Sequence, residues 1–205
     1  MAQGSLQANG SISIPELNFH AVDASRWPDM EALFGVKGAC GGCWCMVRRL
    51  PRAQFESQKG EMNKQAMRAL VLSGPPPGML AYSGRTPIGW CAFGPRSNYL
   101  GFLKSRILKP IDDLDVWAVV CFFIQKPYRR KGLTIAFLKE VMAYAKRQGA
   151  TILEAYPLDP KDKASPDVFA WPGLYSAYRA VGFAEVARRS SIRPIVRYSL
   201  TGLKV

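Results

Sequence analysis

The chain has 205 residues, 48% of them apolar, so it is long enough for one domain with a substantial core and too apolar to be disordered. Its five cysteines are an odd number, which argues against a disulfide scaffold and favours a reducing cytoplasm. The net charge of +13 comes from scattered Lys and Arg without a zinc-finger, RNP or helix-turn-helix pattern, so we do not expect nucleic acid as the main partner.

Residues 1–13 lack the charged start and the apolar centre of a secretion signal. We interpret them as a flexible leader ahead of a single domain over residues 14–205. No apolar run approaches the ~20 residues that a membrane span needs, so we expect no membrane partner and a cytoplasmic protein.

The loose alternation of Glu16–Val22 predicts a first strand. This strand carries His20, the only histidine, opposite its apolar residues, so we expect an exposed or structural role for that side chain. Asp23 or Ser25 can cap a short helix that continues through Phe34.

Ala39–Arg49 is an irregular segment that holds Cys40, Cys43 and Cys45 in a C-x-x-C-x-C pattern. Three thiolates can ligate zinc or an iron–sulfur cluster if a fourth ligand joins them. A second interpretation is a glycine-rich loop whose thiols pack as small hydrophobic groups. A third makes Trp44 and the cysteines the lining of a substrate pocket. The sequence leaves all three open.

The middle of the chain predicts a helix and then a hairpin. Gln54–Ser73 has apolar residues at spacings of three and four, and a Gly–Pro stretch ends it. Met79–Tyr82 and Ile88–Phe93 flank a turn and predict two antiparallel strands. A polar, basic connector over Arg96–Asp115 follows.

The stretch from Trp117 to Thr134 carries the strongest signal. The apolar run Trp117–Ile124 predicts a buried central strand. The basic turn Arg129–Gly132 opens a helix with apolar residues at helical spacing. A strand, a short basic turn and a helix aim several unpaired backbone N–H groups at one point, and together with the helix dipole they predict a phosphate site.

The last part of the chain returns to the sheet. Thr151–Tyr156 predicts a strand, so the order strand–helix–strand implies a right-handed crossover and parallel pairing. Phe169–Val181 predicts a second helix, and Glu185–Arg189 and Ile192–Leu200 predict the closing strands.

Two of these segments resemble motifs of the GNAT acetyltransferase superfamily. Arg129–Thr134, RRKGLT, resembles the R/Q-x-x-G-x-G/A pyrophosphate loop, with Thr134 where the family prefers Gly or Ala. Tyr178–Phe183, YRAVGF, resembles the Y-x-x-x-G-F element that follows the cofactor helix. The resemblance covers roughly Met79–Leu200. It implies an α/β GNAT fold, a mixed central sheet of about six to seven strands with helices on both faces.

The resemblance also implies the reaction, which is transfer of the acetyl group of acetyl-CoA to an amine by direct attack on the thioester in a ternary complex. Coenzyme A thioester and an amine acceptor are then the expected partners, and a homodimer is one option for the assembly. The residues that the resemblance assigns to the cofactor are Phe122, Phe123, Ile124, Arg129, Arg130, Lys131, Gly132, Leu133 and Thr134.

Acetyl transfer needs a proton donor for the departing thiolate and a neutral amine, and free alkyl amines are mostly charged at neutral pH. Tyr178 matches the tyrosine of the family motif and is the predicted acid, with Tyr175 in reserve. Glu154 is our first choice for the base and Asp115 the second, while a water-mediated route without a dedicated base is equally open.

In the family, the acceptor side is built largely from the segment between the first two strands, which points to Trp44 and Cys45 as substrate-binding residues. Two other functions remain open. One is a GNAT-like module that binds acyl-CoA without turnover. The other is a metal or redox protein that uses Cys40, Cys43 and Cys45.

Overall fold

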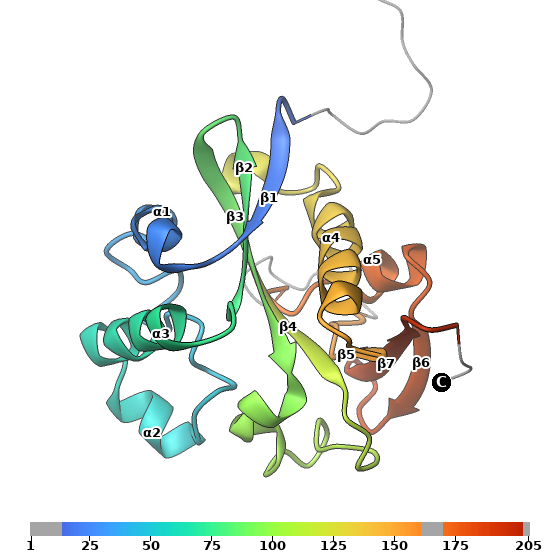
Figure 1. The fold of residues 1–205 in the computed structure, drawn as a ribbon. Coiled ribbons are helices and arrows are strands. Elements are labelled where there is room, and N and C mark those ends of the chain that lie inside the picture. The colour runs from blue at the N-terminus through green and yellow to red at the C-terminus, as the bar shows by residue number, and fades with distance from the viewer. Residues whose placement is uncertain (1–13, 161–169, 203–205) are drawn as a thin grey trace, which may run out of the picture.

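β4 (Trp117–Ile124) is the central strand of the fold, with the bounds that its apolar run predicts. The computed structural model describes residues 14–160 and 170–202, and there β4 belongs to a sheet with the order β1-β2-β3-β4-β5-β7-β6. Helices lie on both faces of this sheet (Figure 1). The predicted α/β fold with a mixed central sheet is confirmed, and the sheet has seven strands. The predicted leader over 1–13 lies outside the described residues.

The bounds of the remaining elements follow in chain order. The other strands are β1 (Leu17–Ala21), β2 (Gly78–Ser83), β3 (Thr86–Pro95), β5 (Ile152–Ala155), β6 (Ala184–Arg188) and β7 (Pro194–Ser199). The α-helices are α1 (Trp27–Phe34), α2 (Arg52–Ser57), α3 (Glu61–Ser73), α4 (Leu133–Arg147) and α5 (Tyr175–Ala180). Short 3-10 turns are η1 (Ala24–Arg26), η2 (Arg96–Asn98), η3 (Leu100–Phe102) and η4 (Lys126–Tyr128).

The strand pairing divides the sheet into two antiparallel halves. β1 to β4 pair antiparallel in chain order, and β5, β7 and β6 form the other half. The two halves meet where β4 pairs parallel with β5, because α4 crosses over between them. The predicted hairpin and the predicted parallel pair are both confirmed.

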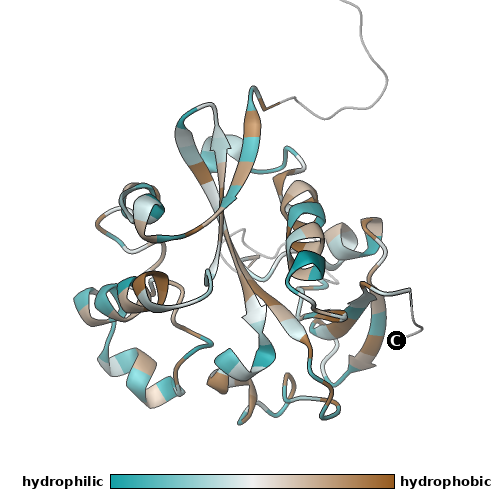
Figure 2. Ribbon diagram, in the orientation of Figure 1, coloured by the Kyte–Doolittle hydropathy of each residue, from teal (hydrophilic) through white to brown (hydrophobic). Residues whose placement is uncertain are grey.

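Each face of the sheet has its own apolar core. α1, α2 and α3 lie on one side and α4 and α5 on the other (Figure 1). Trp90 of β3 packs with Phe34 on the α1 side, while its neighbour Phe93 packs with Val141 on the α4 side. β4 is apolar along its length, whereas α4 alternates between apolar and polar residues (Figure 2). This pattern is typical of a strand covered on both faces and of a helix with one solvent-exposed face.

The two halves of the sheet separate beyond the middle of β4. β4 and β5 are paired from Trp117 and Leu153 as far as Val119 and Ala155. β4 continues to Ile124, so the end of the strand extends beyond its ladder with β5 in the described part of the chain. The sheet therefore opens into a split between its halves.

Two predicted helices have different bounds in the structure. The helix expected over Gln54–Ser73 is interrupted at Gly60, whose φ of 91° is incompatible with a continuous right-handed helix, so α2 and α3 are separate. The helix expected over Phe169–Val181 begins only at Tyr175, because Pro172 and Gly173 (φ 81°) precede it; residue 169 itself is outside the described part. Among the described helices, none has the length and apolarity to cross a membrane.

Candidate active site

A cleft of about 1020 Å³ runs along the C-terminal half of β4. Five segments line it: the cysteine-rich segment after α1, α2 with the residues after it, the end of β4, the basic turn with the start of α4, and the segment that leads into and includes the start of α5. The lining residues are Ala39, Cys40, Gly41, Cys43, Val47, Phe55, Lys59, Cys121, Phe122, Phe123, Ile124, Tyr128, Arg129, Arg130, Gly132, Leu133, Thr134, Ile135, Ala170, Trp171, Gly173, Leu174, Ser176 and Ala177. The cleft thus joins the predicted phosphate turn to the split in the sheet.

The N-terminus of α4 opens into this cleft. Gly132 is the residue before the helix and adopts the left-handed conformation, with φ 76° and ψ 3°. The N–H of Ala136 donates to the carbonyl of Gly132 at 3.1 Å and is the first to join the helical ladder. The N–H groups of residues 133–135 precede it and, by helix geometry, have no intrahelical acceptor. They present the positive end of the helix dipole to the cleft, which suits a phosphate.

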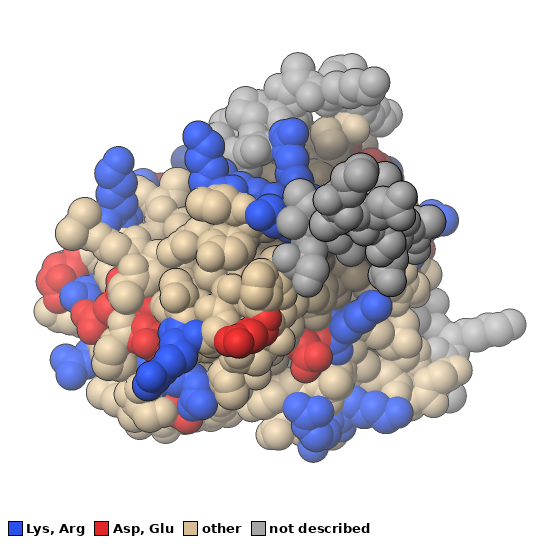
Figure 3. All heavy atoms as spheres, turned by 90° about the horizontal axis from the view of Figure 1, so that it is seen from above, with Lys and Arg blue, Asp and Glu red and all other residues tan. Residues whose placement is uncertain are grey.

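The basic turn adds formal charge to this helix end. Arg129 folds back so that its Nε donates to the carbonyl of Ile124 at 2.9 Å, which ties the turn to the end of β4. The charged side chains among the described lining residues are Lys59, Arg129 and Arg130, all basic. Lys131 is outside the lining, and its ammonium group lies 5.8 Å from the ring centroid of Tyr128. Figure 3 views the molecule from the end where β4 meets α4, and Lys and Arg side chains stand along the upper part of that face.

The end of β4 directs backbone N–H groups into the split. The N–H of Gln125 donates to Ile88 on the β3 side at 3.0 Å. Strand alternation then turns the N–H groups of Phe122 and Ile124 the opposite way. That of Phe122 donates to the carbonyl of Trp171 at 2.6 Å. By the same alternation, the N–H of Ile124 turns toward the split.

The cysteine-rich segment also lines the cleft, with two of the three cysteines that the pocket interpretation named. Its contribution comes from Ala39, Cys40, Gly41 and Cys43. Trp44 and Cys45, the predicted acceptor contacts, are buried in the core instead.

The core contacts of these two side chains explain their absence from the lining. The ring of Trp44 lies 6.0 Å from that of Trp27 and 5.4 Å from that of Phe34. The Sγ of Cys45 accepts a hydrogen bond from Nε1 of Trp90 at 3.3 Å. The structure thus places both side chains in the core, and their predicted contact with the acceptor stays a prediction.

Tyr178, the predicted acid, lies directly behind the cleft wall. It is fully buried, and its hydroxyl donates to the carbonyl of Pro172 at 2.9 Å. Burial raises the pKa of this phenol well above its ordinary value, so it keeps its proton at neutral pH. Gly173, Leu174, Ser176 and Ala177 line the cleft in front of it. Tyr175, the reserve acid, is outside the lining and contacts Arg179 and Arg188.

Glu154, the predicted base, belongs to a buried ion-pair network away from the cleft. Its carboxylate accepts from Nε of Arg197 at 2.8 Å, from Nη1 of Arg96 at 3.2 Å and from the hydroxyl of Tyr156. Arg197 also binds both carboxylate oxygens of Asp112 at 2.7 Å. Every part of the Glu154 carboxylate is therefore engaged, and the geometry favours a structural role. Asp115, the second choice, is exposed and outside the cleft lining.

The three cysteines of the C-x-x-C-x-C pattern differ in exposure. Cys40 is exposed, Cys43 is half-buried and Cys45 is buried. Within residues 14–160 and 170–202, no three His, Cys, Asp or Glu side chains are grouped so that they could hold a metal ion. The metal interpretation of this segment therefore finds no support in the described part of the chain.

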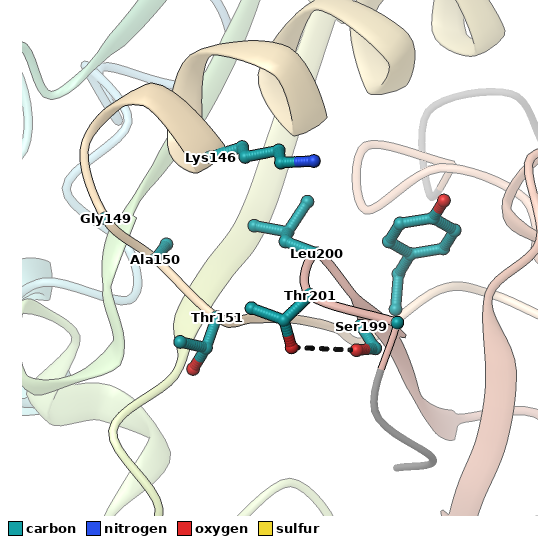
Figure 4. Close-up of a pocket in the computed structure, with 9 residues that line it drawn as sticks. Lys146, Gly149, Ala150, Thr151, Ser199, Leu200 and Thr201 are labelled. Atoms are coloured by element: carbon teal, nitrogen blue, oxygen red, sulfur yellow. Dashed lines mark hydrogen bonds between the residues drawn. The ribbon is translucent and has the colours of Figure 1, made fainter.

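A second hollow, of about 690 Å³, lies at the C-terminal end of α4 (Figure 4). Lys146 and Thr151 border it on one side and Leu200 and Thr201 on the other. On that second side the hydroxyl oxygens of Thr201 and Ser199 are 3.5 Å apart. It presents the negative end of the helix dipole rather than the positive one. We therefore locate the candidate active site in the larger cleft.

Comparison with known proteins identifies the class. The model of the acetyltransferase (GNAT) family matches residues 44–170, more than half of the chain. The chain therefore belongs to the GNAT acetyltransferase family. A search of curated protein sequences finds no match to it.

Solved structures of acetyltransferases match this chain at low sequence identity. An N-acetyltransferase from Staphylococcus aureus Mu50 is 11% identical, with a TM-score of 0.50 and coverage of 90% of this chain and 97% of that one. PaiA N-acetyltransferase from Thermoplasma acidophilum, solved with coenzyme A, is 12% identical, with a TM-score of 0.48 and coverage of 90% and 99%. YncA from Salmonella typhimurium, solved with acetyl-CoA, is 11% identical, with a TM-score of 0.48 and coverage of 92% and 96%.

Local sequence patterns do not identify several of the lining residues. Tyr128 and Ile135 flank the recognised loop, and extending the motif by one residue on either side would have included them. Trp171 was assigned to a helix, and no local pattern shows that its carbonyl binds the N–H of Phe122, far away in the sequence.

Proposed function

We propose that this protein is an N-acetyltransferase that moves the acetyl group of acetyl-CoA to an amine by direct attack on the thioester in a ternary complex. The observation that carries the proposal is the N-terminus of α4, which follows the left-handed Gly132 and faces a cleft with only basic charged lining residues in the described part of the chain. Membership of the GNAT family gives this site its expected ligand.

The cofactor is proposed to lie along the cleft from the helix to the split. The N–H groups after Gly132, together with Arg129, Arg130 and Lys131, bind the pyrophosphate. The pantetheine arm runs beside the end of β4, where Phe122 and Phe123 form the wall. The N–H of Ile124 then donates to the thioester oxygen as negative charge develops on it.

The proton transfers are assigned only in part. Tyr178 is the proposed donor to the departing thiolate, for which its hydroxyl exchanges the carbonyl of Pro172 for the sulfur. Because Glu154 is enclosed by its ion pairs, we propose that the amine loses its proton to water in the cleft rather than to a carboxylate. The acceptor side is formed by the segment from Ala39 to Cys43.

Calorimetric titration with acetyl-CoA tests the cofactor assignment. We expect micromolar binding to the wild type and none to Gly132→Glu, which places a carboxylate at the proposed phosphate site. Gly149→Glu is the matched control, because Gly149 has φ 82° and open space around its Cα, like Gly132, but follows the other end of α4. Absence of binding to the wild type, or equal binding by the two variants, contradicts the proposal.

One observation favours a second candidate, an acyl-CoA-binding module without turnover. The N–H of Phe122 and the hydroxyl of Tyr178, two groups that catalysis can use, both donate to carbonyls of the segment before α5. Release of free coenzyme A in the presence of a panel of amines distinguishes the two functions. Tight binding without amine-dependent release supports the module.

A further inference from the structure

Two arginines lie near one aromatic pair on the α1 side of the split, and among the described residues neither has a carboxylate partner. Arg48 has its guanidinium 5.6 Å from the ring centroids of both Phe102 and Trp171. Arg193 donates from Nη2 to the carbonyl of Tyr156 at 2.9 Å. The rings of Phe102 and Tyr156 lie 4.1 Å apart and link the two side chains.

The environment of this pair is unfavourable for two cations. Burial lowers the pKa of Arg48, and burial together with the charge of Arg48 lowers the pKa of Arg193 to about 10. In the described part of the chain, neither guanidinium has an acidic side chain within salt-bridge distance. The Nε of Arg193 is buried and has no hydrogen-bond partner there.

Three other arginines of this protein pair with carboxylates. Arg96, Arg188 and Arg197 each reach a carboxylate at 3.2 Å or less. Buried charges are normally paired, because leaving a charge unpaired away from water is costly. A pair of half-buried guanidiniums with spare donors and no acid therefore points to an anion that is not part of the fold.

The pair adjoins the proposed acyl end of the cleft. Trp171, whose ring Arg48 faces, lines the cleft, and so does Cys121, whose thiol lies within electrostatic reach of Arg48. The carbonyl of the same Trp171 accepts from the N–H of Phe122 at the split. An anionic group held here would bring the rest of a small molecule close to the place where the thioester is expected.

We propose that Arg48 and Arg193 bind the carboxylate of the acceptor, which is therefore a small amine that carries a carboxylate, such as an amino acid. This inference rests on the proposed acetyltransferase function. The guanidinium carbon of Arg48 lies over the rings of Phe102 and Trp171, which are not hydrogen-bond acceptors for its N–H groups, and a carboxylate can accept two parallel hydrogen bonds from such a fork. Its binding neutralises the repulsion between the two cations and positions the amine for attack.

The test compares amino acids with their primary amides, which keep the amine and lose the negative charge. We expect kcat/KM, corrected for the fraction of free amine, to favour the acids by about 10- to 100-fold, the effect of hydrogen bonds to a charged group. A phosphonate analogue of each acid is the third arm, and stronger activity with phosphonates would reassign the site to phosphate-like groups and overturn the carboxylate inference.

Arg48→Gln and Arg193→Gln are the variants, with Arg189→Gln as a control in the same connection between β6 and β7. We expect both variants to lose the preference for acids while their rates with amides and their affinity for coenzyme A stay unchanged. Arg193→Gln also removes the hydrogen bond to the carbonyl of Tyr156, so all rates are compared well below the melting temperature of each variant.

A second readout does not depend on turnover. The same acids, but not the amides, are expected to raise the melting temperature of the wild type loaded with coenzyme A, and to have no effect on Arg193→Gln. Acids that act neither as acceptors nor as stabilising ligands overturn the inference. Failure of acetyl-CoA to bind in calorimetry overturns the proposed function instead, and the two failures are thereby distinguished.

Discussion

The buried network around Glu154 makes a sharp prediction about the variant Glu154→Gln. The substitution keeps the shape of the side chain but replaces one carboxylate oxygen with an NH2 group. In the native protein both oxygens accept hydrogen bonds, from Arg197 at 2.8 Å and from Arg96 at 3.2 Å. The amide must therefore direct its own N–H groups at a donor, and it removes the charge that compensates two buried guanidiniums.

The expected loss is at the lower end of the range for a broken buried ion pair. Removing one partner of such a pair typically costs about 3–5 kcal/mol. Here Arg197 keeps both bonds to Asp112 at 2.7 Å, and Arg96 keeps the carbonyls of Asp112 and Leu114 at 2.9 Å. We therefore expect about 3 kcal/mol, or a fall in melting temperature of about 6–12 °C for a chain of this size.

Urea unfolding of the purified variant measures this loss, and acetyl transfer measured well below the melting temperature supplies the second readout. Glu185→Gln is the matched control, because Glu185 also pairs with an arginine on a strand, at 2.7 Å from Arg188, but on the surface. Its loss should stay below about 1 kcal/mol. A Glu154→Gln protein as stable as the wild type but with kcat reduced 100-fold would refute the structural assignment and restore Glu154 as the base.

Three further outcomes can be checked. Gly132→Ala and Gly149→Ala should each lower the free energy of unfolding in urea by about 1–2 kcal/mol. Both residues adopt the left-handed conformation, and the added Cβ meets no atom within 4 Å, so the cost is purely conformational. A loss of stability in only one of the two variants contradicts this explanation. Hydrogen bonds from the guanidinium of Arg197 lower the pKa of Asp112, so the stabilisation from this carboxylate is present above its unfolded pKa near 4 and is lost as pH falls through its folded pKa. The difference in unfolding free energy between the wild type and Asp112→Asn should therefore be constant from pH 5 to 7 and shrink in stronger acid. A difference that grows in acid contradicts the reasoning. A thiol reagent should label the exposed Cys40 first and the buried Cys91 only on unfolding. Acetyl-CoA should slow the labelling of Cys40, because that residue lines the cleft, and an unchanged labelling rate argues against the proposed binding mode.

The sequence predicted the central strand and the turn before α4 because both depend on local chemistry. A continuous apolar run can form only a buried element, and β4 ends where that run ends. Gly132 was predictable because a helix that starts directly after a tight turn needs a residue able to adopt positive φ.

The remaining site residues depend on contacts that local patterns do not contain. Alternation placed Glu154 on one face of β5 but gave no information on which residues that face meets, and its partners come from distant segments. Trp44 and Cys45 both have positive φ, at 43° and 60°, in a segment without periodicity, so no pattern could show which side chains point to the cleft. Arg48 and Arg193 belong to different ends of the chain, and only the folded sheet brings them together.

The hydrogen bond from Phe122 to Trp171 has a consequence for how the protein distinguishes a loaded cofactor from a spent one. At Phe122 a thioester oxygen would have to displace a carbonyl that the chain itself supplies at 2.6 Å. Such an exchange replaces one hydrogen bond with another, so it would contribute little of the ~1 kcal/mol that a new bond is worth. Any preference for acetyl-CoA over free coenzyme A at this end of β4 therefore depends on the N–H of Ile124, the donor proposed above, and not on that of Phe122.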